Sequence, residues 1–311
     1  MFWIGRLVLR ADTTGLPGPP SNGAPVLRLG VFDAASHVTE PQLSDFLVYE
    51  SYRLPGVCLV GGSRAHFAEL NRCSARLPKD LPELTFSVTP QMHASEREHI
   101  LDSVFGQGIV ARNAVRLAGG RPVHIGPITL KPRFNAVATS TGDPATPGGP
   151  DAFDDRTDHR QGTPFAAAWM LASVRALSIE GVSSLTYFET TGPRGLLLDS
   201  DRSPFPVHRL TGWLTALAGC TLLDVTGDVP QGIHVLAANS ATDPVVLLSN
   251  VGPETRTVDV VLPTDVVGVD AARLTAHGDQ EALTIRMSGP DGHRVRFELR
   301  PDDVIRLAGR R

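Results

Sequence analysis

Strand-like and helix-like segments alternate along residues 25–220, and this alternation restricts the fold more than any other feature of the sequence. Segments with helical periodicity separate the apolar runs, and the segment Phe165–Ile179 has the clearest helical spacing. Such an alternation predicts a parallel sheet with helices packed on it, as in a (β/α) barrel. The five apolar runs with the length of a buried strand are Val26–Asp33, Gly56–Gly61, Leu84–Thr89, Val123–Leu130 and Leu185–Glu189.

Four further helices are expected from apolar spacing and from residues that start or stop helices. Their predicted spans are Glu40–Glu50, His66–Arg72, a helix from Ser95 to about Leu117, and Val207–Ala218; the short segment His66–Arg72 could also be a turn. The sequence Ser95–Glu98 fits a capping box, which would begin the third of these helices. The Gly119-Gly120 pair would end it, because glycine readily adopts the left-handed conformation beyond a helix C-terminus.

The texture of the sequence changes after Cys220. From there on, short β-prone runs alternate with turn residues, which predicts an all-β module of the sandwich type. We therefore expect an N-terminal segment at 1–24, a barrel-like domain at 25–220 and a β-sandwich domain at 221–311. A closed barrel needs eight strands. The expected fold class is thus α/β, a partial TIM-like barrel followed by an all-β sandwich-like domain.

Composition and charge exclude several classes of function. The net charge is −4 and no basic stripe is present, which argues against nucleic-acid binding. Cys58, Cys73 and Cys220 lie far apart and the His residues form no H-x-H or H-E-x-x-H motif, so no disulfide framework or zinc site is expected. Phosphate-binding loops and G-x-S-x-G are missing, and no cofactor is expected, although a cation held by carboxylates stays open. Without a long apolar segment or secretory signal, we expect a cytoplasmic protein with no membrane partner.

Glu189 is the first candidate for a catalytic residue. It ends a predicted strand after Tyr187 and Phe188, and chemistry in parallel β/α folds is placed at the carboxyl ends of strands. As a general base or nucleophile, it would have a pKa raised by apolar surroundings. The alternative is an ion pair with Arg194. Asp33, at another strand end, is the candidate second carboxylate, with a turn-capping role as its alternative.

Other polar residues that follow predicted strands would line the same mouth: Asn71, Gln91, His93, Arg133 and Asn135. His93 could act as an acid or hydrogen-bond donor, or be a packed structural histidine. Arg133 could hold substrate hydroxyls or steady developing charge. Asn71 and Glu69 lie together after the second strand and could bind sugar hydroxyls or cap a helix.

Three further candidates for substrate binding lie close to the Phe165 helix or to Glu189. Tyr187 could orient Glu189 or fill the core. Arg160 and Gln161 stand at the end of the long polar loop 138–163. We expect this loop to lie over the site, because long loops in compact domains are often functional lids; a disordered insertion is the alternative.

Six segments, in the same order along the chain, resemble the D-apionate lactonase family. The resemblance covers about residues 56–215. The segments are FAELNR (Phe67–Arg72), TPQMHA (Thr89–Ala94), GPITLKPRFN (Gly126–Asn135), HRQ (His159–Gln161), FAAAW (Phe165–Trp169) and TYFETTG (Thr186–Gly192).

The resemblance implies a glycosidase-like TIM barrel with β domains on both sides, from which this chain would lack the N-terminal domain and the first barrel strands. It implies a hydrolase that opens a sugar-acid lactone of the D-apionolactone type, in the catabolism of the branched sugar apiose, by carboxylate-assisted attack of water. The alternatives are a glycoside hydrolase with Glu189 as nucleophile and an inactive barrel remnant. An incomplete barrel would leave an unpaired sheet edge, through which the chain could self-associate.

Overall fold

The computed structural model describes residues 6–10, 26–33, 35–41, 56–132, 157–198, 203–239, 243–289 and 293–311. The chain forms two compact units, each described by itself. We call them the sheet unit, Trp3–Arg156 with Leu177–Tyr187, and the sandwich unit, Met1–Phe2 with Thr157–Ala176 and Phe188–Arg311. The domain boundaries expected from the sequence remain a prediction.

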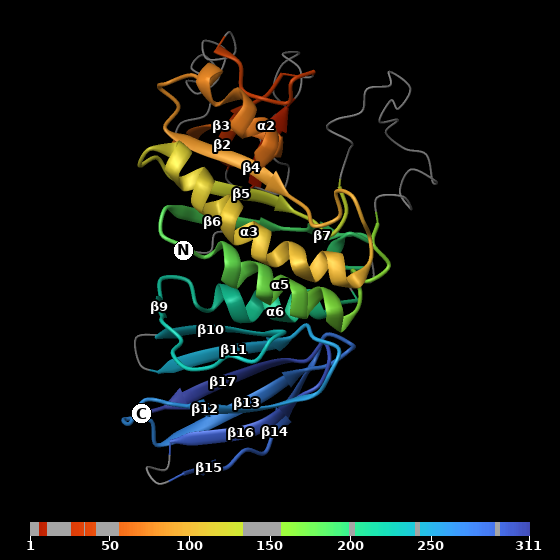
Figure 1. Cartoon of the computed structure of the whole chain (residues 1–311), viewed down its shortest axis with the longest axis vertical. Coiled ribbons are helices and arrows are strands. Elements are labelled where there is room, and N and C mark those ends of the chain that lie inside the picture. The colour runs from red at the N-terminus through yellow and green to blue at the C-terminus, as the bar shows by residue number, and fades with distance from the viewer. Residues whose placement is uncertain are drawn as a thin grey trace. The chain divides into compact units, whose positions relative to one another are not determined.

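The sheet unit contains a six-stranded sheet in which every pair of neighbouring strands is parallel. The strands follow one another in chain order across the sheet (Figure 1). They are β1 (Arg6–Arg10), β2 (Val26–Val31), β3 (Cys58–His66), β4 (Glu83–Val88), β5 (Val123–Ile128) and β6 (Val182–Tyr187). Among the described strands β6 does not pair with β1, so the sheet is open. The partial (β/α) barrel is confirmed, with β1 as a strand that the sequence analysis missed.

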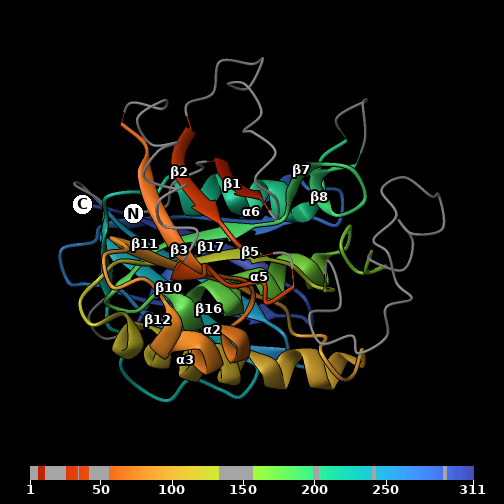
Figure 2. The same ribbon diagram turned by 90° about the horizontal axis from the view of Figure 1, so that it is seen from above.

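Two helices of the sheet unit, α2 (Phe67–Cys73) and α3 (Arg97–Ala118), lie on one side of this sheet (Figure 2). A short 3₁₀ turn, η2 (Ser74–Arg76), follows α2. The rings of Phe67 and Phe86 meet edge to face with their centroids 5.7 Å apart, which fixes α2 on β4.

The ends of α3 test the signals read from the sequence. The capping box at Ser95 is wrong: α3 has Glu96 as its N-cap, and no side chain caps it. The Glu96 carboxylate instead accepts a hydrogen bond from the Ser95 N–H, at 3.0 Å. At the other end Gly119 adopts a left-handed conformation, as expected. The helix expected at Glu40–Glu50 lies outside the described residues beyond Pro41.

The Gly61-Gly62 pair lies inside β3, although the sequence analysis placed the end of the strand there. Gly62 has a φ of +133°, and a Cβ at this position would lie 2.3 Å from the carbonyl oxygen of Thr85. Glycine is therefore needed here for a close approach of β3 to β4. The strand continues to His66, so its carboxyl end lies five residues beyond the predicted one.

A partly buried polar network crosses the sheet near the amino ends of its strands. The Arg28 guanidinium donates to Glu83 at 2.6 Å, and the same carboxylate oxygen lies 3.1 Å from Nε2 of His124. The other ring nitrogen of His124, Nδ1, is 2.6 Å from the Ser184 hydroxyl. Burial, aided by the charge of Arg28 and opposed by Glu83, lowers the pKa of His124.

The sandwich unit contains helices α5 (Pro164–Leu177) and α6 (Pro206–Thr215) and two antiparallel sheets. One sheet has the order β14-β13-β17-β11-β10-β9 and the other the order β12-β16-β15. Their strands are β9 (Thr221–Leu223), β10 (Ile233–Asn239), β11 (Pro244–Asn250), β12 (Arg256–Val261), β13 (Gly268–Leu274), β14 (Gln280–Leu283), β15 (Met287–Ser288), β16 (Arg294–Leu299) and β17 (Val304–Arg310).

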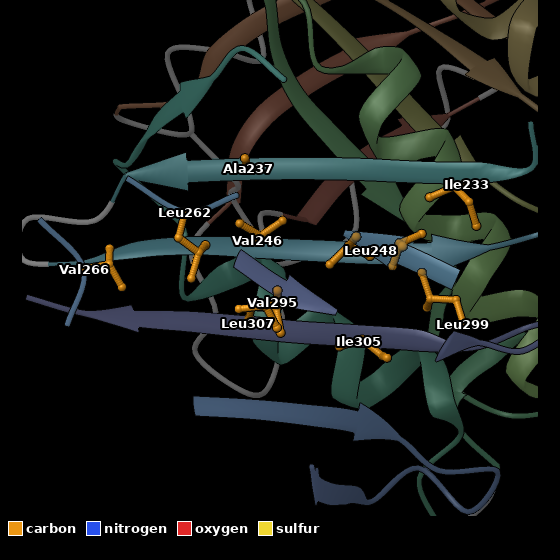
Figure 3. Close-up of a cluster of buried hydrophobic side chains, with 11 residues drawn as sticks. Ile233, Ala237, Val246, Leu248, Leu262, Val266, Val295, Leu299, Ile305 and Leu307 are labelled. Atoms are coloured by element: carbon orange, nitrogen blue, oxygen red, sulfur yellow. The ribbon is translucent and has the colours of Figure 1, made fainter. Parts of the chain in front are cut away.

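Side chains from both antiparallel sheets share one hydrophobic core (Figure 3). Leu248 and Leu307 come from the larger sheet and Val295 from the smaller one, and all three are buried. This arrangement is a β-sandwich, as expected from the alternating pattern of the sequence. None of the helices in the described part of the chain combines the length and apolar character that crossing a membrane requires.

Candidate functional site

The carboxyl ends of β2 and β3 bring His37 and Arg64 together in the sheet unit, and the charge of Glu69, on α2, acts on His37. The Arg64 guanidinium donates through Nε to Nδ1 of His37, at 3.1 Å. Burial and the nearby charge of Arg64 lower the pKa of His37, which is consistent with a neutral ring that accepts this hydrogen bond. Glu69 is buried on α2, where its carboxylate accepts from the His66 N–H at 3.1 Å and pairs with Arg72 at 3.3 Å.

Asp33 follows β2, as predicted, but its carboxylate shapes the chain around it. Oδ1 accepts hydrogen bonds from the N–H groups of Ala35 and Ser36, at 2.9 and 2.8 Å. These two bonds lower the pKa of Asp33, the one from Ser36 having the larger effect. The structure thus contains the turn-capping role that the sequence left open beside a catalytic one.

The candidates after β4 and β3 differ in their exposure. Gln91 is buried, whereas His93, in the same loop, and Asn71, on α2, are exposed. Tyr187 is the last residue of β6 and is half-buried. The remaining two candidates, Arg133 and Asn135, lie outside the described residues.

Glu189 belongs to the sandwich unit, where it begins the short strand β7 (Glu189–Thr191). This strand pairs with β8 (Gly195–Leu197), and the Glu189 N–H donates to the Arg194 carbonyl. The carboxylate oxygen Oε1 lies 2.7 Å from Nη2 of Arg194, and the side chain is 40% exposed. The ion pair named as the alternative is therefore present, and the apolar enclosure expected for Glu189 is not found. The pair fixes the direction in which the carboxylate points.

Phe188, the residue before Glu189, has an unusual backbone conformation. Its φ is +57°, in the left-handed region that costs a residue with a bulky side chain about 1–3 kcal/mol. The side chain is buried, and its ring centroid lies 6.4 Å from that of Trp169. Packing thus holds in place a strained bend that directs the chain into Glu189.

Arg160 and Gln161 lie just before α5 in the sandwich unit, and Gln161 contacts the strand that pairs with the Glu189 segment. Arg160 forms a bidentate ion pair with the buried Asp158, at 2.8 and 2.7 Å, and its guanidinium lies 5.4 Å from the centre of the Phe165 ring. The Gln161 amide donates to the carbonyl oxygen of Gly195 in β8, at 3.1 Å. Both residues hold the beginning of α5 in place, a role that the sequence analysis did not assign to them.

The sequence analysis did not select His37, Arg64 or Asp158. It gave Glu69 a sugar-binding or a helix-capping role, and the structure contains the capping contact at the start of α2. His37 and Arg64 meet because β3 extends beyond the glycine pair and because His37 has a φ of +58°. Among the described residues no group of three or more His, Cys, Asp or Glu side chains is placed to hold a metal ion.

Comparison with known proteins relates this geometry to a family. Residues 35–219 match the family model described as D-apionate lactonase, TIM barrel domain. The chain belongs to the D-apionate lactonase family. The resemblance read from the ordered segments is thereby confirmed. The matched range includes Glu189 and Arg194, and it also includes His37, Arg64 and Glu69.

One member of the D-apionate lactonase family, from Brucella anthropi, is 27% identical over 228 residues, which are 71% of this chain and 36% of that protein. The chain thus spans about a third of the length of this curated relative. Solved structures share the fold at low identity. A glycoside hydrolase family 51 arabinofuranosidase from Xanthomonas axonopodis pv. citri has a TM-score of 0.63 and 12% identity, over 92% of this chain and 67% of that one. A family 30 subfamily 8 xylanase from Clostridium acetobutylicum has a TM-score of 0.57 and 14% identity, over 93% and 67%.

Proposed function

We propose that this chain carries the catalytic site of a hydrolase that opens a sugar-derived lactone of the D-apionolactone type. The observation that carries the proposal is the match to the D-apionate lactonase barrel over residues 35–219. This range spans the strand ends at which β/α enzymes place their chemistry. It also includes Glu189 and every other candidate residue except Asp33.

Lactone opening needs a base for the attacking water, donors for the oxyanion and an acid for the leaving alkoxide. In our proposal, the Glu189 carboxylate takes a proton from water as the water oxygen bonds to the lactone carbonyl carbon. The ring C–O bond then breaks, and the alkoxide takes up a proton, from the proposed acid His93 or from the protonated Glu189, to give the open hydroxy acid. Arg194 orients the Glu189 carboxylate through the 2.7 Å ion pair.

The other predicted residues keep their proposed parts in this reaction. His93 is the proposed acid or oxyanion donor, and its exposure leaves it accessible to a ligand. Asp33 is the weaker candidate for a second carboxylate, because its Oδ1 already accepts two backbone hydrogen bonds.

The test is acid release from a panel of aldonolactones by this chain and its Glu189→Gln variant. We expect turnover to fall at least about 100-fold, because glutamine cannot accept the proton. Glu180→Gln, at an exposed position before β6, is the matched control and should retain full activity. Circular dichroism of each sample checks folding. Wild-type activity in the folded Glu189→Gln variant would exclude Glu189 as the base.

A second candidate function is glycoside hydrolysis with Glu189 as the nucleophile. It is favoured by the fold shared with the arabinofuranosidase and the xylanase, because glycosidases of similar fold use paired carboxylates. A slow fluorinated glycoside should then leave a covalent sugar on Glu189, detected by mass spectrometry of the peptide. Lactone turnover without such an adduct would favour the lactonase.

A further inference from the structure

The outer face of α3 carries a row of exposed side chains at alternating spacings of four and three residues. This spacing is the period of a coiled-coil seam, so the row stays on one side of the helix. Two large apolar residues stand at its centre: Phe105 is 76% exposed and Ile109 is 41% exposed. The members of the row, which we call the α3 seam, are Glu98, Asp102, Phe105, Ile109, Arg112 and Arg116, and all six are exposed.

The α3 seam is complementary to itself in charge. Two carboxylates precede the apolar centre and two guanidinium groups follow it. A two-fold axis beside the helix, level with position 107, would place Phe105 opposite Ile109 of the second copy, Asp102 opposite Arg112, and Glu98 opposite Arg116. A second, antiparallel α3 helix would therefore place apolar against apolar and acid against base at every step.

The helix dipole does not account for this pattern. Acidic residues near a helix N-terminus and basic ones near the C-terminus are favourable, but the effect falls off within the first and last turns. Asp102 and Arg112 lie beyond those turns of a helix that spans Arg97–Ala118. Within one helix the pairs Glu98 with Asp102 and Arg112 with Arg116 are like charges four residues apart, which is unfavourable. Nor does the dipole favour Phe105 and Ile109 at the surface.

The surface beside Phe105 is open. Gly106 lies next to Phe105, and no heavy atom lies within 4 Å of the place that a Cβ would take. Among the described residues, the charged members of the seam have no ion-pair partner. Between its outer members the seam is roughly 27 Å long at the rise of an α-helix.

We propose that α3 is the contact surface for a second copy of this chain, in an antiparallel helix pair about a two-fold axis at position 107. Asp102 of each copy faces Arg112 of the other, and Phe105 packs against Ile109. One helix face per copy gives an interface at the small end of specific contacts. We therefore expect a weak dimer, with a dissociation constant on the order of 100 μM, that dissociates as salt screens the charges. This inference is independent of the proposed function.

A charge swap tests the proposal. Sedimentation equilibrium of the whole chain would be measured at protein concentrations of about 100 μM, at low and at high salt. Asp102→Arg or Arg112→Asp places like charges opposite each other and should weaken association at least about tenfold. The double variant Asp102→Arg with Arg112→Asp restores opposite charges and should restore association. Asp80→Arg, the same charge change at an exposed site outside α3, should leave association unchanged.

Each result decides the matter once circular dichroism has shown the variants to be folded. Weakening by both single changes and rescue by the double change establishes the α3 pair. A wild-type chain that stays monomeric at these concentrations overturns it. So does a dimer that ignores the single changes, which would instead point to the open edge of the parallel sheet, or a double variant no better than the single ones.

Discussion

Protonation of His124 should make the stability of this protein depend on pH just below neutrality. The side chain of His124 is 5% exposed, and its ring nitrogens face Glu83 and Ser184, with Arg28 close by. Because burial lowers its pKa from the ordinary value of 6.5, the folded chain binds this proton more weakly than the unfolded chain. Stability is therefore present above pH 6.5 and falls as pH drops through the window between the unfolded and folded pKa values.

The slope of this loss has a fixed upper limit. One proton taken up only by the unfolded chain lowers the free energy of unfolding by about 1.4 kcal/mol per pH unit. Glu83 does not interfere in this window, because its ion pair with Arg28, together with His124, lowers its pKa below the ordinary 4.5 despite burial. His37 and His234 also have pKa values lowered by burial, so the wild-type slope can exceed the contribution of His124.

Urea unfolding of the wild type and His124→Gln at several pH values between 7.5 and 5 isolates the single residue. The variant loses the hydrogen bond and the packing of the ring at every pH, which lowers its stability by a constant amount. Its slope below pH 6.5 should be shallower than that of the wild type by up to about 1.4 kcal/mol per pH unit. Parallel slopes, or a His124 pKa at or above 6.5 measured by NMR, would refute the reasoning.

Two further changes test one contact in each unit, a close approach of two strands in the sheet unit and a buried ion pair in the sandwich unit. Gly62→Ala should lower stability by roughly 1–3 kcal/mol, because the new Cβ meets the Thr85 carbonyl at 2.3 Å; Gly56→Ala, also at positive φ but with nothing within 4 Å, should cost less, as thermal unfolding would show. Arg160→Met should cost about 3–5 kcal/mol in urea unfolding, because it leaves the carboxylate of Asp158, 1% exposed, without its bidentate partner; a loss below about 1 kcal/mol would contradict this.

The sequence predicted the strands that are defined by their own composition. β2, β4 and β5 are largely apolar, because a parallel sheet is covered on both faces. Both ends of each strand lie within two residues of the predicted ones. β1 was missed because Arg6 and Arg10 bound a run of only five residues, which becomes a strand through its pairing with β2. The predicted β3 was too short, because two consecutive glycines normally indicate the end of a strand. Here they lie inside the strand and allow β4 to approach closely.

The candidate site shows the same division between local and distant causes. The pairing of Glu189 with Arg194 could be read from the sequence, because a tight turn at Gly192 brings residues five apart together. The contact between His37 and Arg64 could not, because it depends on strand register and on a left-handed residue. Asp33 was read correctly as a strand-end residue, but which neighbours its carboxylate binds was settled by the turn that follows.

The chain order of the parallel sheet has a consequence for biosynthesis. Every strand of this sheet after β1 pairs with the strand made before it, so the sheet can grow at one edge as the ribosome delivers each new segment. The time between the synthesis of one strand and that of the next is longest after β5, because α5 and the residues before it must be made before β6. During that interval β5 is an exposed edge, the place where a nascent chain would most readily pair with the wrong partner. A chaperone that protects this protein on the ribosome should therefore act between the synthesis of β5 and that of β6.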